Sequence, residues 1–269
     1  MSDIAKINGK RGIIMGIAND RSIAWGIASA LSQEGANLIF SYPNDSIKKR
    51  IEPLAKKCNS KDFFPCDVSD EDSIKSFFQT INSQFGSIDF LVHSIAFSDK
   101  DELKGEYIET SKENFLNTMN ISCYSFTSVC KYASKIMENG GNIVTLSYYG
   151  AEKVMPHYNV MGVAKSALET SVKYIAADLG KKNIRVNAIS AGPIKTLASS
   201  GISDFKYILK WNEYNAPLKR TITIEEVGKN ALFLLSDLSS GVTGEVLHVD
   251  CGYHVVGMKA VDAPDISVV

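Results

Sequence analysis

The chain has 269 residues, of which 45% are hydrophobic and 22% charged, and its formal net charge is −1. This composition is typical of a folded globular protein, and the near-neutral charge gives no general attraction to nucleic acid or to an acidic membrane surface. The five cysteines form neither a CxxC nor a Cys/His metal spacing, and no apolar run has membrane-spanning length or the form of a signal peptide. We therefore expect a soluble, cytoplasmic protein with no metal site and no nucleic-acid or membrane partner.

Short apolar runs alternate with longer helical patterns along the chain. This alternation predicts parallel βαβ units with right-handed crossovers, and hence one doubly wound α/β domain over residues 1–258. We expect a seven-stranded, mainly parallel sheet with helices on both faces, followed by a tail at 259–269. The expected strands lie near 12–16, 37–41, 62–66, 88–92, 142–146, 184–189 and 245–249, and the helices near 22–34, 45–57, 71–85, 112–138, 157–179 and 225–235.

Two stretches interrupt this alternation. Residues 97–109 are polar and loop-like, and residues 196–217 combine apolar and charged positions at helical spacing. Ligands of open α/β sheets bind beyond the carboxyl ends of the strands, so an insertion after the sixth strand suits a substrate lid. A pair of surface helices packed on the sheet edge would give the same pattern.

A dinucleotide site is suggested at the end of the first strand. Gly16 closes the strand and Ser22 opens the first helix, so the backbone could approach a pyrophosphate at the helix N-terminus. The segment is not GxGxxG, and a tight strand–helix turn without a ligand is the alternative. Asp67, after the third strand, could bind an adenine amino group or cap the next helix. Ser94, after the fourth, could leave room for a ribose or satisfy a loop backbone.

The residues after the second strand bear on the choice of dinucleotide. An NADP site usually carries Arg or Lys there, whereas the turn from Ser41 to Asp45 has no base. Lys48 to Arg50 follow on an expected helix, where a solvated face explains them as well. NADH is therefore expected over NADPH.

Tyr158 and Lys165 are seven residues apart, about two helical turns, so both side chains would share one helix face. A phenol can donate to an oxygen that becomes negative, and an ammonium can hold cofactor hydroxyls. An aromatic at the edge of the core beside a solvated lysine would show the same spacing.

Seven motifs occur in one order along the chain and together resemble a known family. They are Gly16 to Gly26, Cys66 to Val68, His93 to Ile95, Leu146 to Glu152, Tyr158 with Lys165, Arg185 to Thr196, and Gly244 to Asp250. The chain resembles the enoyl-acyl-carrier-protein reductases of bacterial type II fatty-acid synthesis, the NADH-using branch of the short-chain dehydrogenase/reductase superfamily, which has a Rossmann-type fold. Each motif is modest alone, but seven in register are specific and extend to about Met258.

The resemblance implies the reaction and the roles of three residues. Hydride from NADH would reduce a trans-2-enoyl thioester at its β-carbon, the final step of the elongation cycle, and charge would move onto the thioester oxygen. Tyr158 would donate to that oxygen, and Lys165 would bind the nicotinamide ribose hydroxyls. Tyr148 would line the pocket and support proton delivery.

The same resemblance implies the binding residues. The cofactor-binding positions would be Gly16, Ser22, Ile23, Asp67, Val68, Ser94, Ile95, Lys165, Ile194 and Thr196. The substrate-binding positions would be Ala96, Tyr148, Tyr158, Met161, Ala198, Ile202 and Phe205. The chain departs from the common family form at Pro43, where a polar adenosine contact is usual, and at Ala96 and Cys251, where glycine is usual.

The implied partners are an acyl carrier protein and three further copies of the chain in a homotetramer. Lys206 and Lys210 are the candidates for contacting the acidic carrier, unless they belong to an ordinary helix surface.

Two other functions compete with this interpretation. A short-chain alcohol or β-ketoacyl reductase would carry a Tyr-x3-Lys pair, but the residue four after Tyr158 is Gly162. Ser147 stands near the place where such reductases have a serine. A catalytically silent dinucleotide-binding sensor would not need Tyr148, Tyr158 and Lys165 to be intact.

Overall fold

The computed structural model describes residues 5–197, 199 and 204–266. Its centre is a seven-stranded sheet of order β3-β2-β1-β4-β5-β6-β7, in which every neighbouring pair is parallel. The predicted doubly wound sheet is confirmed, and it is wholly rather than mainly parallel in the described residues. The strands are β1 Arg11–Met15, β2 Asn37–Tyr42, β3 Phe63–Pro65, β4 Phe90–His93, β5 Gly141–Ser147, β6 Ile184–Ala191 and β7 Val246–Val249.

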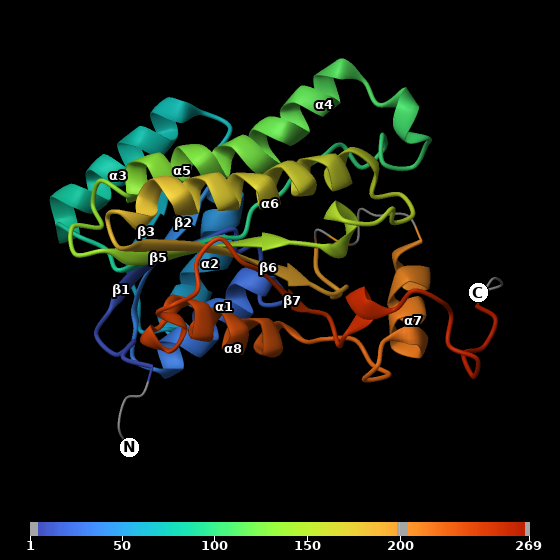
Figure 1. Ribbon diagram of the computed structural model, residues 1–269. Helices are drawn as coiled ribbons and strands as arrows, with labels where there is room; N and C mark the ends of the chain where they lie inside the picture. The colour runs from blue at the N-terminus through green and yellow to red at the C-terminus, as the bar shows by residue number, and fades with distance from the viewer. Residues whose placement is uncertain (1–4, 198, 200–203, 267–269) are drawn as a thin grey trace.

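Helices cover both faces of the sheet (Figure 1). On one face lie α3 (Glu71–Phe85), α4 (Lys112–Met119), α5 (Ser125–Ala133) and α6 (Asn159–Gly180). On the other lie α1 (Ile23–Gln33), α2 (Asp45–Lys57) and α8 (Ile224–Leu235). Each face has its own hydrophobic core, formed where the apolar stripes of these helices meet the strands.

Two glycines bring α1 and α8 into close contact. A Cβ on Gly26 would collide with the Ile224 carbonyl, and a Cβ on Gly228 would collide with the Gly26 carbonyl. Gly26 therefore serves helix packing, in addition to lying in the first sequence motif.

The strand order reverses at β1, which lies between β2 and β4. Met15 pairs with His93, and Ser147 pairs with Ser190, so the carboxyl ends of these strands meet at one edge of the sheet. A crevice beyond such a switch point is where open α/β sheets bind ligands. The residues after β1, β4, β5 and β6 therefore share one edge.

The long helix expected at 112–138 is broken and shorter, which corrects that prediction. A π-helical turn at Asn120–Tyr124 separates α4 from α5, and α5 ends at Ala133. The Ser125 hydroxyl donates to the Ile121 carbonyl (2.6 Å), and the buried His93 ring contacts Ser125 through Nε2 (2.9 Å). A side chain inserted into the helical ladder in this way disfavours regular α-helix.

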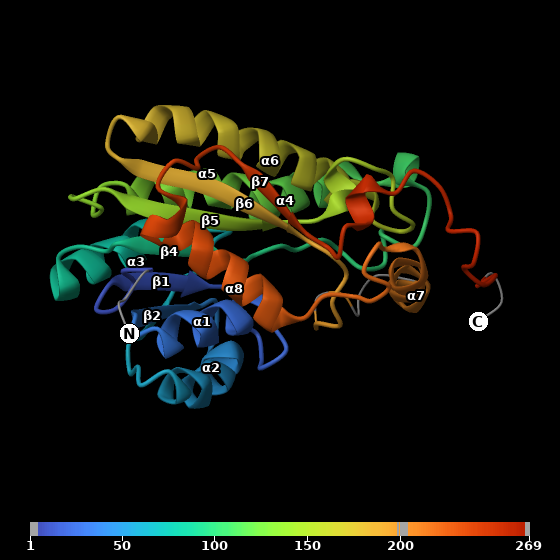
Figure 2. The same cartoon turned by 60° about the horizontal axis from the view of Figure 1, so that its bottom comes forward.

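The segment expected at 196–217 contains α7 (Phe205–Asn215), which stands beyond the strand ends and apart from both helical layers (Figure 2). Two expected substrate residues, Ala198 and Ile202, lie outside the described residues. The described part of the tail packs beside α7, because the Ala260 amide donates to Asn215 Oδ1 (2.8 Å) and Ile266 is buried. Within the described chain, no helix is long and apolar enough to cross a membrane.

Candidate active site

The two tyrosines and the lysine singled out in the sequence lie together at the end of β5. The rings of Tyr148 and Tyr158 meet edge to face, with centroids 5.0 Å apart. Helix α6 begins at Asn159, so Tyr158 is its N-cap residue rather than part of the helix, which corrects the expected start at 157. Lys165 lies inside α6, is 5% exposed and donates from Nζ to the Leu146 carbonyl (2.8 Å).

The backbone around Tyr158 is held in an uncommon conformation. His157 and Asn159 both have positive φ, 55° and 40°, which is unfavourable for residues with a Cβ. Asn159 Nδ2 donates to the Gly105 carbonyl (2.9 Å), and His157 Nε2 lies 3.1 Å from Asp204 Oδ2 at the start of α7. The loop after β4 and the start of α7 therefore both contact the segment that carries Tyr158.

Burial shifts the pKa values of Tyr148, Tyr158 and Lys165. It raises the pKa of Tyr158 and of Tyr148, in each case as the main cause, so both phenols keep their protons at neutral pH. It lowers the pKa of Lys165 to about 8. The Tyr148 hydroxyl is buried and finds no hydrogen-bond partner among the described residues. Because burying a hydroxyl without a hydrogen-bond partner costs free energy, this oxygen is suited to form a hydrogen bond with a ligand.

Two glycines shape the space around the tyrosine rings. A Cβ on Gly150 would lie 2.7 Å from Cε1 of Tyr158, and closer still to Cδ1. A Cβ on Gly162 would lie 2.8 Å from the Gly150 carbonyl oxygen. A side chain at the position four after Tyr158 would therefore crowd the Gly150 carbonyl, which disfavours a Tyr-x3-Lys pair in this fold.

Gly16 has φ +96, and any Cβ on it would collide with the Ser94 carbonyl. The glycine thus permits the close approach of the chain segments that follow β1 and β4, a reason that the sequence did not reveal. Ser22 Oγ accepts from the amides of Ala18 and Asn19 (3.0 and 3.1 Å), which fixes the loop before α1. In the described residues the Ser22 side chain does not cap α1, so it leaves the first amides of the helix without that partner.

The cofactor candidates after β3 and β6 are held by local hydrogen bonds. Asp67 Oδ1 accepts from the amide and hydroxyl of Ser69 (2.9 and 2.7 Å), while Asp70 is the residue that caps α3. Asp67 is therefore not the helix cap, and its exposed carboxylate lies at the carboxyl end of β3. Val68 beside it is buried. Thr196, after β6, is held by reciprocal bonds with Ser199.

Several of the other candidate positions follow the strand ends. Ser94 and Ile95 come directly after β4, and the Ile95 side chain reaches Gly16. The Phe97 amide in the following loop donates to the Ser122 hydroxyl (2.9 Å). Ala96 is exposed in the same loop. Met161 is buried in the first turn of α6, and Phe205 begins α7.

One basic side chain reaches the end of β2. Lys48 Nζ lies 5.6 Å from the centroid of the Tyr42 ring, within cation–π range. Lys48 is therefore turned toward the strand end, whereas the sequence left open a fully solvated position.

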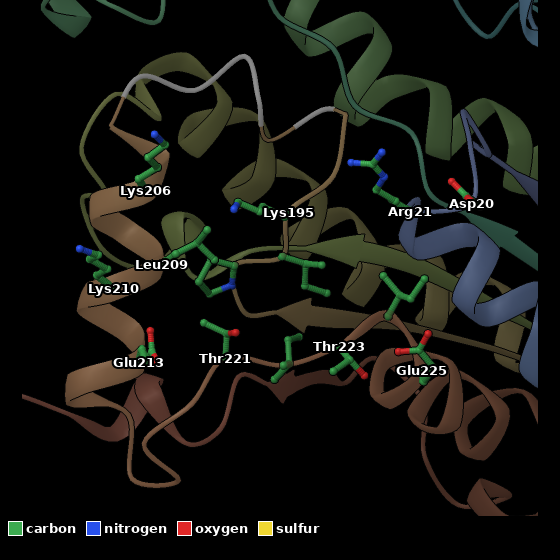
Figure 3. A pocket seen from close by; sticks show the side chains of 14 residues that line it. Asp20, Arg21, Lys195, Lys206, Leu209, Lys210, Glu213, Thr221, Thr223 and Glu225 are labelled. Carbon is green, nitrogen blue, oxygen red and sulfur yellow. The ribbon is translucent and has the colours of Figure 1, made fainter. Parts of the chain in front are cut away.

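A cavity of about 600 Å³ opens between α7, the start of α8 and the loop before α1 (Figure 3). Ile194 and Lys195 line it from the β6 side, and Lys206 and Lys210 line it from α7. Arg21 contributes a further cation, and Asp20, Glu213 and Glu225 contribute acids. The cavity connects the expected cofactor contact at Ile194 with the basic side of α7.

Comparison with known proteins decides the family. A family model described as enoyl-(acyl carrier protein) reductase matches residues 16–254. The chain belongs to the enoyl-acyl-carrier-protein reductase family. The enoyl-acyl-carrier-protein reductase (NADH) 1 of Rhizobium meliloti (strain 1021) is 67% identical to this reductase over 262 residues, covering 97% of this chain and 96% of the relative. The FabI protein of Rickettsia prowazekii (strain Madrid E) is 55% identical, covering 93% and 96%.

Solved structures agree with this assignment. The reductase of Anaplasma phagocytophilum, crystallised in complex with NAD, is 59% identical with a TM-score of 0.92 over 97% of both chains. The Bacillus cereus reductase, crystallised with NADP⁺ and an indole naphthyridinone, is 51% identical with a TM-score of 0.92, covering 94% of this chain and 99% of the other. The family and the Rossmann-type fold expected from the motifs are confirmed.

One contact in the reductase was not anticipated. The Ser147 hydroxyl donates to Glu169 Oε1 (2.5 Å), one helical turn beyond Lys165. The four-residue spacing of Lys165 and Glu169 is visible in the sequence. Ser147, which Glu169 contacts, lies on strand β5, so no local pattern in the sequence reveals this contact.

Proposed function

We propose that the enzyme reduces the trans-2 double bond of enoyl-acyl-carrier-protein thioesters with NADH, in the final step of fatty-acid elongation. The single observation that carries the proposal is the edge-to-face contact of Tyr148 with Tyr158 at the end of β5, where Lys165 also donates to the Leu146 carbonyl, in a chain of this family. When bound, the nicotinamide cofactor supplies the hydride.

The described residues suit a dinucleotide along the crevice. The first amides of α1 and the backbone at Gly16 would hold the pyrophosphate, and Asp67 with Val68 would hold the adenine. Ser22 and Ile23 would contribute at the phosphates, and Ser94 with Ile95 would flank the ribose. Ile194 and Thr196 would contact the nicotinamide end. Lys165 has three N–H groups and one of them reaches Leu146, so it keeps donors for the ribose hydroxyls.

Tyr158 would carry the electrostatic part of the reaction. As hydride adds to the β-carbon, the electron pair of the double bond moves toward the thioester oxygen, which becomes an enolate. The Tyr158 hydroxyl donates to that oxygen, and its raised pKa keeps it a hydrogen-bond donor. The Lys165 ammonium adds positive charge nearby. A proton at the α-carbon then completes the saturated thioester, and the unpaired Tyr148 hydroxyl is placed to support its delivery.

An assay with matched substrates tests the reaction. Purified protein should oxidise NADH with a trans-2-enoyl thioester and do so much more slowly with an acetoacetyl thioester. The reason is the long Tyr–Lys separation, together with the crowding of the Gly150 carbonyl by any side chain at Gly162, where a carbonyl reductase has its lysine. Faster turnover of the β-keto thioester would refute the enoyl assignment.

We propose that α7 closes over the acyl chain as a lid. Phe205 and Met161 would contact the acyl chain, with Ala96 at the pocket rim. The pairing of Asp204 with His157 connects the start of α7 to the Tyr158 segment, so closing of α7 and placement of the tyrosine are linked. Such a lid would exclude water from the enolate.

The acyl carrier protein would approach along the basic side of α7. Lys206 and Lys210 are four residues apart on one helix face and border the cavity (Figure 3). Lys206→Glu should raise KM for a carrier-linked enoyl thioester and leave KM for a short coenzyme-linked thioester unchanged. Lys229→Glu, an exposed charge reversal on α8, is the matched control. Equal changes with both thioesters would refute carrier docking at α7.

We also propose a homotetramer in the cytoplasm. Exposed apolar side chains on the α4–α6 face, among them Leu116, Val163 and Tyr174, support burial against another copy. All five cysteines are free and buried, which suits a reducing compartment. Analytical ultracentrifugation, with Tyr174→Lys as the disruptive variant, tests the assembly. A wild-type monomer in solution would contradict it.

A further inference from the structure

A carboxylate from the catalytic helix is bonded to the strand that carries Tyr148. Glu169 Oε1 accepts the Ser147 hydroxyl at 2.5 Å, and Ser147 is 5% exposed. The preceding residue of the strand, Leu146, accepts the Lys165 ammonium at 2.8 Å. Two residues one turn apart on α6 thus hold two successive residues at the end of β5, immediately before Tyr148.

The surroundings of Glu169 are polar but crowded. Glu152 and His248 contact each other at 2.6 Å. The charge of Glu152 raises the pKa of Glu169, whereas His248 and Lys173, one turn further along α6, lower it. Burial is the main cause that raises the pKa of Glu169, and the Ser147 hydroxyl opposes it. The side chain is half-buried and accepts the Ser147 hydroxyl, a contact that favours its carboxylate form. The negative charge of that form raises the pKa of Lys165.

Two further ionisable groups interact with Lys165, and both are uncharged near neutral pH. Burial raises the pKa of the Cys123 thiol, and burial with the Lys165 charge lowers the pKa of His93 to about 3. Tyr158, at the head of the same helix, keeps its proton because burial raises its pKa. Of Cys123, His93, Tyr158 and Glu169, Glu169 alone therefore carries a charge that balances the ammonium.

We propose that Glu169 is a positioning residue of this active site, acting in two separable ways. Through Ser147 it fixes the end of β5, from which Tyr148 faces Tyr158, and through its charge it keeps Lys165 protonated. The inference rests on the proposed function, in which Lys165 binds the cofactor ribose as an ammonium. Ser147 thereby holds the carboxylate, rather than serving the tyrosine as in carbonyl reductases.

The two actions can be separated by substitution. Glu169→Gln keeps an oxygen to accept the Ser147 hydroxyl but removes the charge, whereas Ser147→Ala keeps the charge but removes the bond. Asp178→Asn, an exposed charge removal near the end of α6, is the matched control. It lies 13 residues from Lys165, roughly 20 Å along the helix. Melting temperature and oligomer size should be recorded for each variant.

The decisive measurement is NADH affinity against pH, by fluorescence titration, which does not depend on turnover. Loss of one nearby charge should lower the Lys165 pKa by about one unit. Starting from a pKa of about 8, the protonated fraction then falls about eightfold at pH 8.5 and by only about a tenth at pH 6. Glu169→Gln should therefore weaken NADH binding about eightfold at pH 8.5 and hardly at all at pH 6, while Asp178→Asn changes neither.

Ser147→Ala should show the complementary result. NADH affinity should follow the wild-type pH dependence, and kcat with an enoyl thioester should fall about tenfold, because Tyr148 is less well placed. The same NADH affinity ratio at both pH values for Glu169→Gln would overturn the charge role, and unchanged kcat in Ser147→Ala would overturn the bridging role. A wild-type protein that binds NADH but does not reduce enoyl thioesters would instead refute the proposed function.

Discussion

Gly150→Ala is expected to disable the reductase by moving Tyr158, without touching the cofactor crevice. The new methyl group would lie 2.7 Å from Cε1 of Tyr158. Carbon atoms pack at about 3.5–4 Å, so the ring must move by about 1 Å. A displacement of that size at a reacting group costs about 100-fold in rate. Overpacking of this kind costs about 1–3 kcal/mol of folding stability.

The assay measures kcat with a trans-2-enoyl thioester, NADH affinity by titration and the free energy of unfolding. We expect kcat to fall about 100-fold and NADH affinity to stay within about twofold, because Lys165 and the first turn of α1 are unchanged. Gly241→Ala is the control, since no described heavy atom lies within 4 Å of a Cβ at that position. A Gly150→Ala enzyme with wild-type kcat would refute the argument that Tyr158 must stay where this glycine allows it.

Four further outcomes are expected. Lys165→Ala should chiefly weaken NADH binding, whereas Tyr158→Phe should keep NADH affinity and lower kcat about 100-fold or more; equal loss of affinity would contradict this division. NADH should give a higher kcat/KM than NADPH, and Lys48→Ala should reduce only the residual NADPH activity. A wild-type preference for NADPH would refute the argument that the turn after β2 lacks a base for the 2′-phosphate. His93 has a folded pKa of about 3 against 6.5 in the unfolded chain, so the unfolded state binds the extra proton and stability falls as pH drops through that window. Urea unfolding should show about 2 kcal/mol of loss at pH 5 from this group, and His93→Gln should lose correspondingly less on acidification than the wild type. Amide hydrogen exchange in α7 should slow when NADH and an acyl ligand are both bound, and full protection in the free protein would mean a fixed element.

The sequence determined the fold class because the signals for it are local. Apolar runs of strand length alternate with helical periodicity from β1 to β7, and right-handed crossovers then allow essentially one kind of sheet. The order of the motifs identified the family, since each motif is a short segment, and all but the Tyr158 and Lys165 pair include or directly follow the carboxyl end of a strand. Tyr158, Lys165 and Tyr148 could be selected on the same grounds, although their contacts could not.

The tertiary structure decided what depends on residues that are far apart in the chain. The π-helical turn before Ser125 goes with a contact to His93 on β4, so helical periodicity alone predicted one long helix. Tyr158 caps α6 instead of lying within it, beside backbone that the loop after β4 holds in an unfavourable conformation. Glu169 meets Ser147 only because α6 packs along β5. Periodicity and propensity report on neighbours along the chain, whereas such contacts exist only once the two segments have packed together.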